Sequence, residues 1–315
     1  MLKHVHNLDG DLSPNTSVNP SLSELLPPLP VPKRSWASWF SGVISVILLI
    51  AILLQLRTFG FAKALDILPT SAYFWMAFAA YYVVLPTSEW MIYRRLWRIP
   101  IDGFAALLRK LISNDLLLGY SGEAYFYTWA RRRMNLVAAP FGAVKDVSIL
   151  SALAGNLMTL VMLAVAYPQV GSLGPQFNLD PQDIVKSAAF IVVLSMSFLI
   201  FRKRIFSLPR SDLGFIFGMH VVRLLAALGL SVTLWHLGMP GVPLVLLIML
   251  ATLQLLVTRL PFVTNKEIVF AALAGLIVAE DARAVIALIA TAILATHLFV
   301  GAILAMAELL SVRRV

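Results

Sequence analysis

Long apolar stretches constrain this chain more than any other feature. The first, at about 36–56, has no charged residue inside it and contains the run 43–50 of aliphatic side chains broken by one serine. About 20 apolar residues suffice to cross a hydrocarbon core as a helix. Over the whole chain 60% of the residues are hydrophobic and 13% are charged, about half the charged fraction of a soluble domain. We therefore expect an integral membrane protein.

The apolar stretches predict a helical bundle. Expected spans lie at about 36–56, 68–84, 147–166, 184–201, 213–237, 242–257 and 283–310. The second is expected to end at Pro86, because proline lacks the backbone donor and clashes with the preceding turn. The expected fold class is all-α, a polytopic membrane helix bundle with six or seven spans plus one or two broken or re-entrant helices.

The N-terminal segment differs from the rest of the chain. Residues 1–36 are polar, contain six prolines and do not begin with an apolar run, so a secretory signal is not expected. We expect a disordered Pro-rich tail at 1–36 and a transmembrane helical domain at 37–315. The stretch 25–30 is either an unremarkable part of this tail or a polyproline docking motif.

Basic residues indicate an orientation. Lys and Arg outnumber Asp and Glu by 25 to 16, and they gather between apolar segments, at 94–98, 109–110, 131–133 and 202–204. This bias places those loops and the N-terminus in the cytoplasm, with membrane lipids rather than nucleic acid as partners. The expected location is a bacterial cytoplasmic membrane. The side of the C-terminus stays open.

Two interrupted apolar segments, at 119–130 and 261–279, carry polar turns that are each followed by a glutamate, Glu123 or Glu267. The halves around the first break are too short to span and have basic flanks. A re-entrant hairpin explains this pattern, and a surface-lying amphipathic pair is the alternative. Paired interrupted helices point to a transport site, although each glutamate could instead cap its own short helix.

Charged residues within apolar segments supply the candidate site. A carboxylate at the bilayer centre costs about 2.5–3.5 kcal/mol, so Glu123 is expected to pair with Arg131–Arg133, Arg223 or Arg259. Arg223 lies deep in a span and shares a helix face with His220; it is either a substrate ligand or part of a structural ion pair. His297 is expected to be a hydrogen-bonded core residue. The predicted substrate-binding residues are Glu123, Arg223, Arg259, Glu267, Asn114 and Asn265.

Signatures of catalysis are missing from the sequence. The chain has no metalloprotease HExxH motif, no GxSxG nucleophile motif and no P-loop, so hydrolysis of ATP at a P-loop is excluded. It contains no cysteine, which excludes a Cys-based metal site. We predict no catalytic residue, metal or cofactor.

The run 116–123, followed by three arginines at 131–133, resembles the lysylphosphatidylglycerol synthase transmembrane-region family. Members carry an apolar run, a Pro or small residue, and a Gly-Glu pair that opens a short helix. The segment from Arg259 to Glu267 resembles the second Pro–Glu element of that family, and the shared layout covers about 37–312. This chain departs from the pattern at 119–121 and 262–265, where the usual Pro–Arg and Gly-rich residues are replaced.

The resemblance implies the handling of a lipid between leaflets, without the aminoacyl transfer of the full-length synthases. The function expected is translocation of a lipid or lipid-linked substrate, with Arg223 and Arg259 neutralising a phosphate headgroup. One alternative is a non-transporting scaffold subunit of a lipid- or polysaccharide-handling complex, assembled with other membrane subunits or a second copy. The other is a membrane-embedded transferase.

Overall fold

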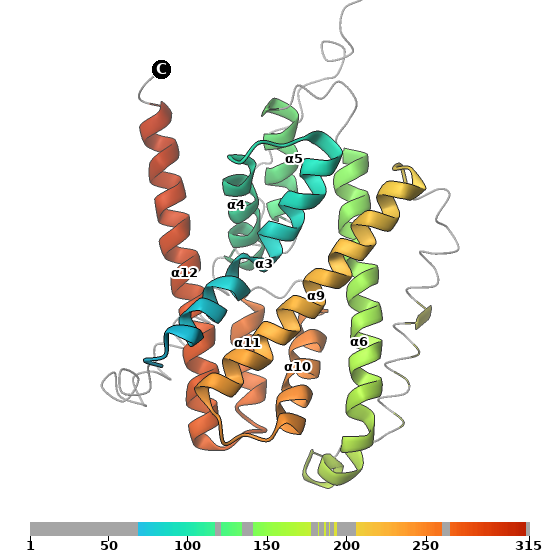
Figure 1. The fold of residues 1–315 in the computed structure, drawn as a ribbon, viewed down its shortest axis with the longest axis vertical. Helices are drawn as coiled ribbons and strands as arrows, with labels where there is room; N and C mark the ends of the chain where they lie inside the picture. The colour runs from blue at the N-terminus through green and yellow to red at the C-terminus, as the bar shows by residue number, and fades with distance from the viewer. Residues whose placement is uncertain are drawn as a thin grey trace, which may run out of the picture. The chain divides into compact units, whose positions relative to one another are not determined.

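The computed structural model describes residues 69–116, 121–133, 141–177, 206–259 and 265–312, with isolated positions at 182, 186, 189, 192 and 193. Every regular element within them is a helix, which confirms the all-α prediction for this part of the chain (Figure 1). The expected tail at 1–36 and span at 36–56 lie outside the described residues, as does the span at 184–201 except at four isolated positions.

Three helices are long and apolar enough to cross a membrane, namely α6 (Phe141–Phe177), α9 (Arg210–Gly238) and α12 (Glu280–Val312). They contain the spans predicted at 147–166, 213–237 and 283–310. The span predicted at 242–257 corresponds to α10, which has 15 residues. At 1.5 Å per residue it covers about 22 Å, less than the roughly 30 Å of a hydrocarbon core. The described residues thus contain three such helices rather than six or seven.

Helix α3 (Ala72–Trp97) does not end at Pro86, so that prediction was wrong. The proline costs one backbone hydrogen bond, and buried side chains on both sides of it hold the helix together. Phe78 and Tyr82 precede it, and Ile92 and Tyr93 follow it. Because the helix continues, Glu89 lies in its interior and is only 5% exposed.

The first interrupted segment forms a helical hairpin of α4 (Gly103–Leu116) and α5 (Ser121–Arg133). At the open end, Asp102 Oδ2 pairs with Arg133 Nη2 at 2.9 Å. At the closed end, Gly122 lies so near the carbonyl oxygen of Lys110 that a Cβ atom would overlap it. The two helices therefore run antiparallel in close contact, as the predicted hairpin requires.

The second interrupted segment forms a similar pair, α10 (Leu244–Thr258) and α11 (Lys266–Ala274). Its closed end is joined by a 2.8 Å hydrogen bond from Lys266 Nζ to the carbonyl of Thr258. Helix α11 has nine residues, which agrees with the short apolar piece predicted there.

The two hairpins point toward each other from opposite ends of α9 (Figure 1). Near the start of α9, Asp212 accepts a 3.2 Å hydrogen bond from Arg95 of α3, and the chain then leads from α3 into α4. At the other end, a turn at 239–243 leads from α9 into α10. The closed ends meet where the backbone N–H of Asn265 donates to the carbonyl of Asp115 at 2.9 Å. We call this hydrogen bond the tip contact.

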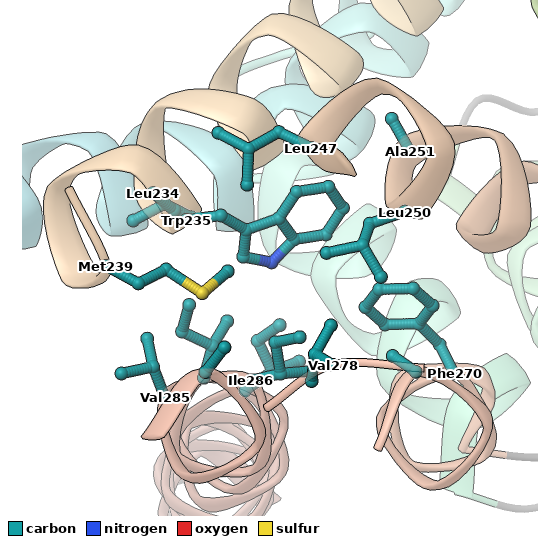
Figure 2. Close-up of a cluster of buried hydrophobic side chains, with 14 of the residues drawn as sticks. Leu234, Trp235, Met239, Leu247, Leu250, Ala251, Phe270, Val278, Val285 and Ile286 are labelled. Atoms are coloured by element: carbon teal, nitrogen blue, oxygen red, sulfur yellow. The ribbon is translucent and has the colours of Figure 1, made fainter. Parts of the chain in front are cut away.

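Separate apolar clusters support the two hairpins. Figure 2 shows Trp235 of α9 among side chains of α10, α11 and α12, and its ring stacks on Phe270 with centroids 5.4 Å apart. A second cluster joins α4 and α5 to α3, α6 and α9 around Tyr93 and Phe126, whose rings are 4.5 Å apart. Each hairpin is thus held by its own core, which fixes the positions of the polar residues at the tips.

Candidate functional site

Glu123 pairs with Lys110, not with any of the arginines that the sequence suggested. Its Oε1 lies 3.4 Å from Lys110 Nζ and accepts a 3.3 Å hydrogen bond from Asn114 Nδ2. Lys110 also contacts Glu89 Oε1 directly. Lys110, which the sequence analysis grouped with the basic residues between apolar segments, lies inside α4 and is 3% exposed. The close approach of α4 and α5 at Gly122 brings the cation to the carboxylate.

Lys110 is held in its charged form by two carboxylates. Burial alone lowers the pKa of its ammonium, but Glu89 and Glu123 outweigh burial and raise that pKa above its ordinary value. The two carboxylates can accept further hydrogen bonds, because Oε2 of each is buried without a hydrogen-bond partner among the described residues. One cation therefore serves two carboxylates inside the bundle.

His220 and Arg223 share the face of α9 that packs against α6, as their spacing predicted. His220 Nε2 lies 3.2 Å from the carbonyl of Val147, and Arg223 Nη2 donates to Ser151 Oγ at 3.2 Å. Glu89 also attracts Arg223 electrostatically. These contacts place Arg223 between α9 and α6, within electrostatic range of Glu89.

Arg259 approaches the same stretch of α6. Its guanidinium lies against Gly155, where any Cβ atom would collide with it. Gly155 is one helical turn after Ser151, the partner of Arg223, and residues four apart lie on one helix face. The structure thus brings the two predicted arginines to neighbouring positions along α6.

Glu267 has neutral partners. Its Oε1 accepts a 2.7 Å hydrogen bond from Tyr81, and its Oε2 accepts a 3.0 Å bond from Gln254 Nε2. Burial raises the pKa of the Glu267 carboxyl above its ordinary value, against the opposing effect of these hydrogen bonds. Ser231 and Trp235 help to line a cavity beside the carboxyl, with room for about one water molecule. The side chain of Glu267 thus bonds to residues of α3 and α10, which does not fit the alternative that it caps its own helix α11.

His297 is hydrogen bonded on both sides, as predicted for a core residue. Its Nδ1 lies 2.9 Å from the hydroxyl of Tyr82, and its Nε2 lies 3.1 Å from Asp115 Oδ2. The side chain of His297 is 5% exposed, whereas that of Asp115 is 32% exposed. This series of hydrogen bonds therefore links α3 and α12 to the tip of the first hairpin.

The two predicted asparagines shape the tips. Asn114 Oδ1 accepts a 2.8 Å hydrogen bond from the backbone N–H of Gly122, which ties the end of α4 to the start of α5. Asn265 precedes α11 with φ of 50°, a left-handed conformation that asparagine tolerates better than most residues. Both residues thus position backbone and neighbouring side chains at the tip contact.

The structure adds residues that the sequence analysis did not select as site members, namely Glu89, Lys110, Asp115, Tyr81 and Gln254. Glu89 was missed because the helix was expected to end at Pro86. Gln254 carried a usable signal, since it is the only strongly polar side chain within the apolar segment 244–257 apart from Thr252, and polar side chains in such segments tend to be functional or to bond other helices.

No family model matches the chain, and comparisons with curated proteins and with solved structures find no match. Within the part of the chain that the structure describes, no three His, Cys, Asp or Glu side chains gather to hold a metal ion. The function is therefore argued from the residues of the site.

Proposed function

We propose that this chain moves a lipid or lipid-linked substrate between the leaflets of a membrane, without hydrolysing ATP, at a site between the tips of its two hairpins. The tip contact between Asp115 and Asn265 carries the proposal. In many transporters, interrupted helices entering from opposite sides build the substrate site near the bilayer midplane. The proposal keeps the expected total of six or seven spans: the three long helices, those at 36–56, 68–84 and 184–201, and, for seven, the one at 242–257.

The arginines on α6 suggest the part of the substrate that the site recognises. Arg223 and Arg259 contact positions of α6 that are one helical turn apart, Ser151 and Gly155, and the planar guanidinium binds phosphate oxygens bidentately. Arg223 Nε is buried without a hydrogen-bond partner among the described residues, so it retains a donor for such a group. A phosphate headgroup fits these donors, and the resemblance to a lipid-handling family favours a phospholipid.

Transport can be measured with the full chain in liposomes that carry a fluorescent phospholipid, with a membrane-impermeant quencher added outside. We expect Arg223→Lys and Glu123→Gln each to slow lipid exchange about tenfold or more, because a hydrogen bond to a charged group contributes about 1.5–3 kcal/mol. Arg223→Lys keeps the positive charge and removes the bidentate geometry.

Matched controls lie outside the site. Arg94 is exposed and stacks on Trp90 with 4.7 Å from its Cζ to the ring centroid, so Arg94→Lys should leave exchange unchanged. Glu280→Gln, at the exposed start of α12, is the control for Glu123→Gln. If both site variants transport at the wild-type rate, the site assignment is wrong. Tolerance of both, together with a co-purifying membrane protein, would favour the scaffold alternative.

A further inference from the structure

We infer that Glu267, together with the His297–Asp115 pair, forms a proton-binding site at the junction of the two hairpins. The inference rests on the proposed function in one respect, which is that the bound proton would be the ion coupled to transport. Its geometric basis is a carboxyl at the tip of the second hairpin and an imidazole of α12 that is hydrogen bonded to the tip of the first. Each can be satisfied by hydrogen bonds in more than one charge state.

The carboxyl of Glu267 differs from those of Glu89 and Glu123, because its hydrogen-bond partners among the described residues are neutral. Tyr81 and Gln254 hydrogen bond to it, whereas the other two glutamates contact Lys110. An ionised carboxylate that leaves water without a counter-charge is unfavourable, and uptake of a proton removes that cost. The neutral surroundings of the Glu267 carboxyl thus favour its protonated form.

The same partners can serve both protonation states. Ionised Glu267 accepts hydrogen bonds from the tyrosine hydroxyl and the amide nitrogen. Protonated Glu267 can donate to the amide oxygen once the Gln254 side chain turns over, because an amide offers a donor and an acceptor in nearly the same shape. The water-sized cavity beside Glu267 leaves space for that rearrangement.

His297 and Asp115 provide the second part of the site. When the imidazole is protonated, both ring nitrogens donate, which completes an ion pair with Asp115 and a hydrogen bond to the Tyr82 oxygen. In this hydrogen-bonded series Asp115 is partly exposed and His297 is buried. A proton therefore has a hydrogen-bonded route from the accessible carboxyl to the imidazole.

The two parts act on each other across the tip contact. Asp115 and His297 influence the Glu267 carboxyl electrostatically, with opposite signs. The backbone carbonyl of Asp115 accepts from Asn265, two residues before Glu267. A change of charge at either part therefore changes the forces that hold the hairpins together, which is what coupling of proton binding to substrate passage requires.

The surroundings favour a proton over a metal cation. Tyr81 of α3 and Gln254 of α10 present donors to the carboxyl, whereas sodium and calcium need several oxygen acceptors. The other ionisable groups near the junction are Asp115, His297, Arg259 and Lys266. Helix α9 contributes Ser231 and Trp235, which do not ionise at neutral pH.

The test is an infrared pH titration of the purified full chain in detergent or lipid, followed through the carbonyl stretch of protonated carboxyl groups. We expect a titrating band that Glu267→Gln removes and that the control Glu280→Gln retains. Tyr81→Phe should move the band's midpoint to higher pH, because it removes a donor to the ionised form. His297→Gln should do the same, because His297 acts on the Glu267 carboxyl so as to favour its ionised form. A band unaffected by Glu267→Gln, or by both Tyr81→Phe and His297→Gln, would overturn the inference.

The titration does not depend on transport, so the two proposals can fail separately. A band assigned to Glu267 in a protein that moves no lipid would leave the proton site standing and remove the translocator. Lipid exchange with no pH-dependent band at Glu267 would leave the translocator standing and remove the proton site. If both hold, a pH gradient across the liposome should change the rate of exchange in the wild type and leave Glu267→Gln unchanged.

Discussion

Lys110 compensates the carboxylates of Glu89, whose side chain is buried, and of Glu123, whose side chain is 20% exposed. Glu89 and Glu123 both contact its ammonium, and its side chain is 4% exposed. Replacement by methionine keeps most of the volume and leaves the carboxylates unpaired. Because breaking a buried pair costs about 3–5 kcal/mol, we expect Lys110→Met to lower the free energy of unfolding by about that amount, measured by denaturant unfolding in detergent micelles.

The control for this prediction is an ion pair at the surface. Arg133 and Asp102 are separated by 2.9 Å, and their side chains are 60% and 49% exposed. Such pairs contribute about 0–1 kcal/mol, so Arg133→Met should have little effect. Addition of Glu89→Gln to Lys110→Met should recover part of the loss, and equal losses in the buried and exposed variants would argue against the charge cluster.

At the level of single residues, the sequence indicated which side chains need partners but not which partners they find. Glu123 had to be compensated, since a charge in an apolar segment is costly. The choice of Lys110 depends on the packing of α4 against α5, which hydropathy does not encode. The arginines at 131–133 looked suitable because they are near in sequence, yet Arg133 pairs with Asp102 at the open end of the hairpin.

The closed end of the first hairpin depends on the absence of a side chain at Gly122. A Cβ atom there would overlap the backbone of Lys110, which cannot move as a flexible side chain would. We expect Gly122→Ala to separate the tips of α4 and α5 and to lower the free energy of unfolding by about 1–3 kcal/mol, the usual cost of overpacking.

Gly218 in α9 is the matched control, because nothing lies within 4 Å of a Cβ atom built there. In that open position the change to alanine should stabilise the helix, by up to about 1 kcal/mol. Chemical unfolding of both variants measures the difference. A Gly122→Ala protein as stable as Gly218→Ala would mean that the two helices do not approach as closely as the fold requires.

At the level of elements, interruptions were easier to predict than ends. The breaks at 119–130 and 261–279 were found because short apolar runs alternate with polar turns. The end of α3 was misplaced because Pro86 lies in a helix whose tertiary packing offsets the lost hydrogen bond. The meeting of the two tips could not be derived from one sequence, since it depends on how each hairpin packs against its neighbouring helices.

The long helices have a fixed relative direction. Asp146 near the start of α6 accepts backbone hydrogen bonds from Ser207 and Leu208, just before α9, at 2.7 and 2.9 Å, so the two helices begin at the same end (Figure 1). Helix α12 runs the other way. It passes Gly238 near its start, and its Leu304 carbonyl accepts from Arg109 at 2.6 Å.

These directions predict which positions face the same side of the membrane, and they favour one answer for the C-terminus. The chain has no cysteine, so a single introduced cysteine is the only thiol that a labelling reagent can modify. Cysteines at Phe141 and Ser211 should react with an impermeant thiol reagent from one side, and those at Gly241 and Asp281 from the other; all four positions are exposed. Because α12 runs opposite to α9, the C-terminus should share the side of Ser211, which is the cytoplasmic side in the orientation expected from the basic residues. Labelling of Ser211→Cys and Gly241→Cys from the same side would mean that α9 does not cross.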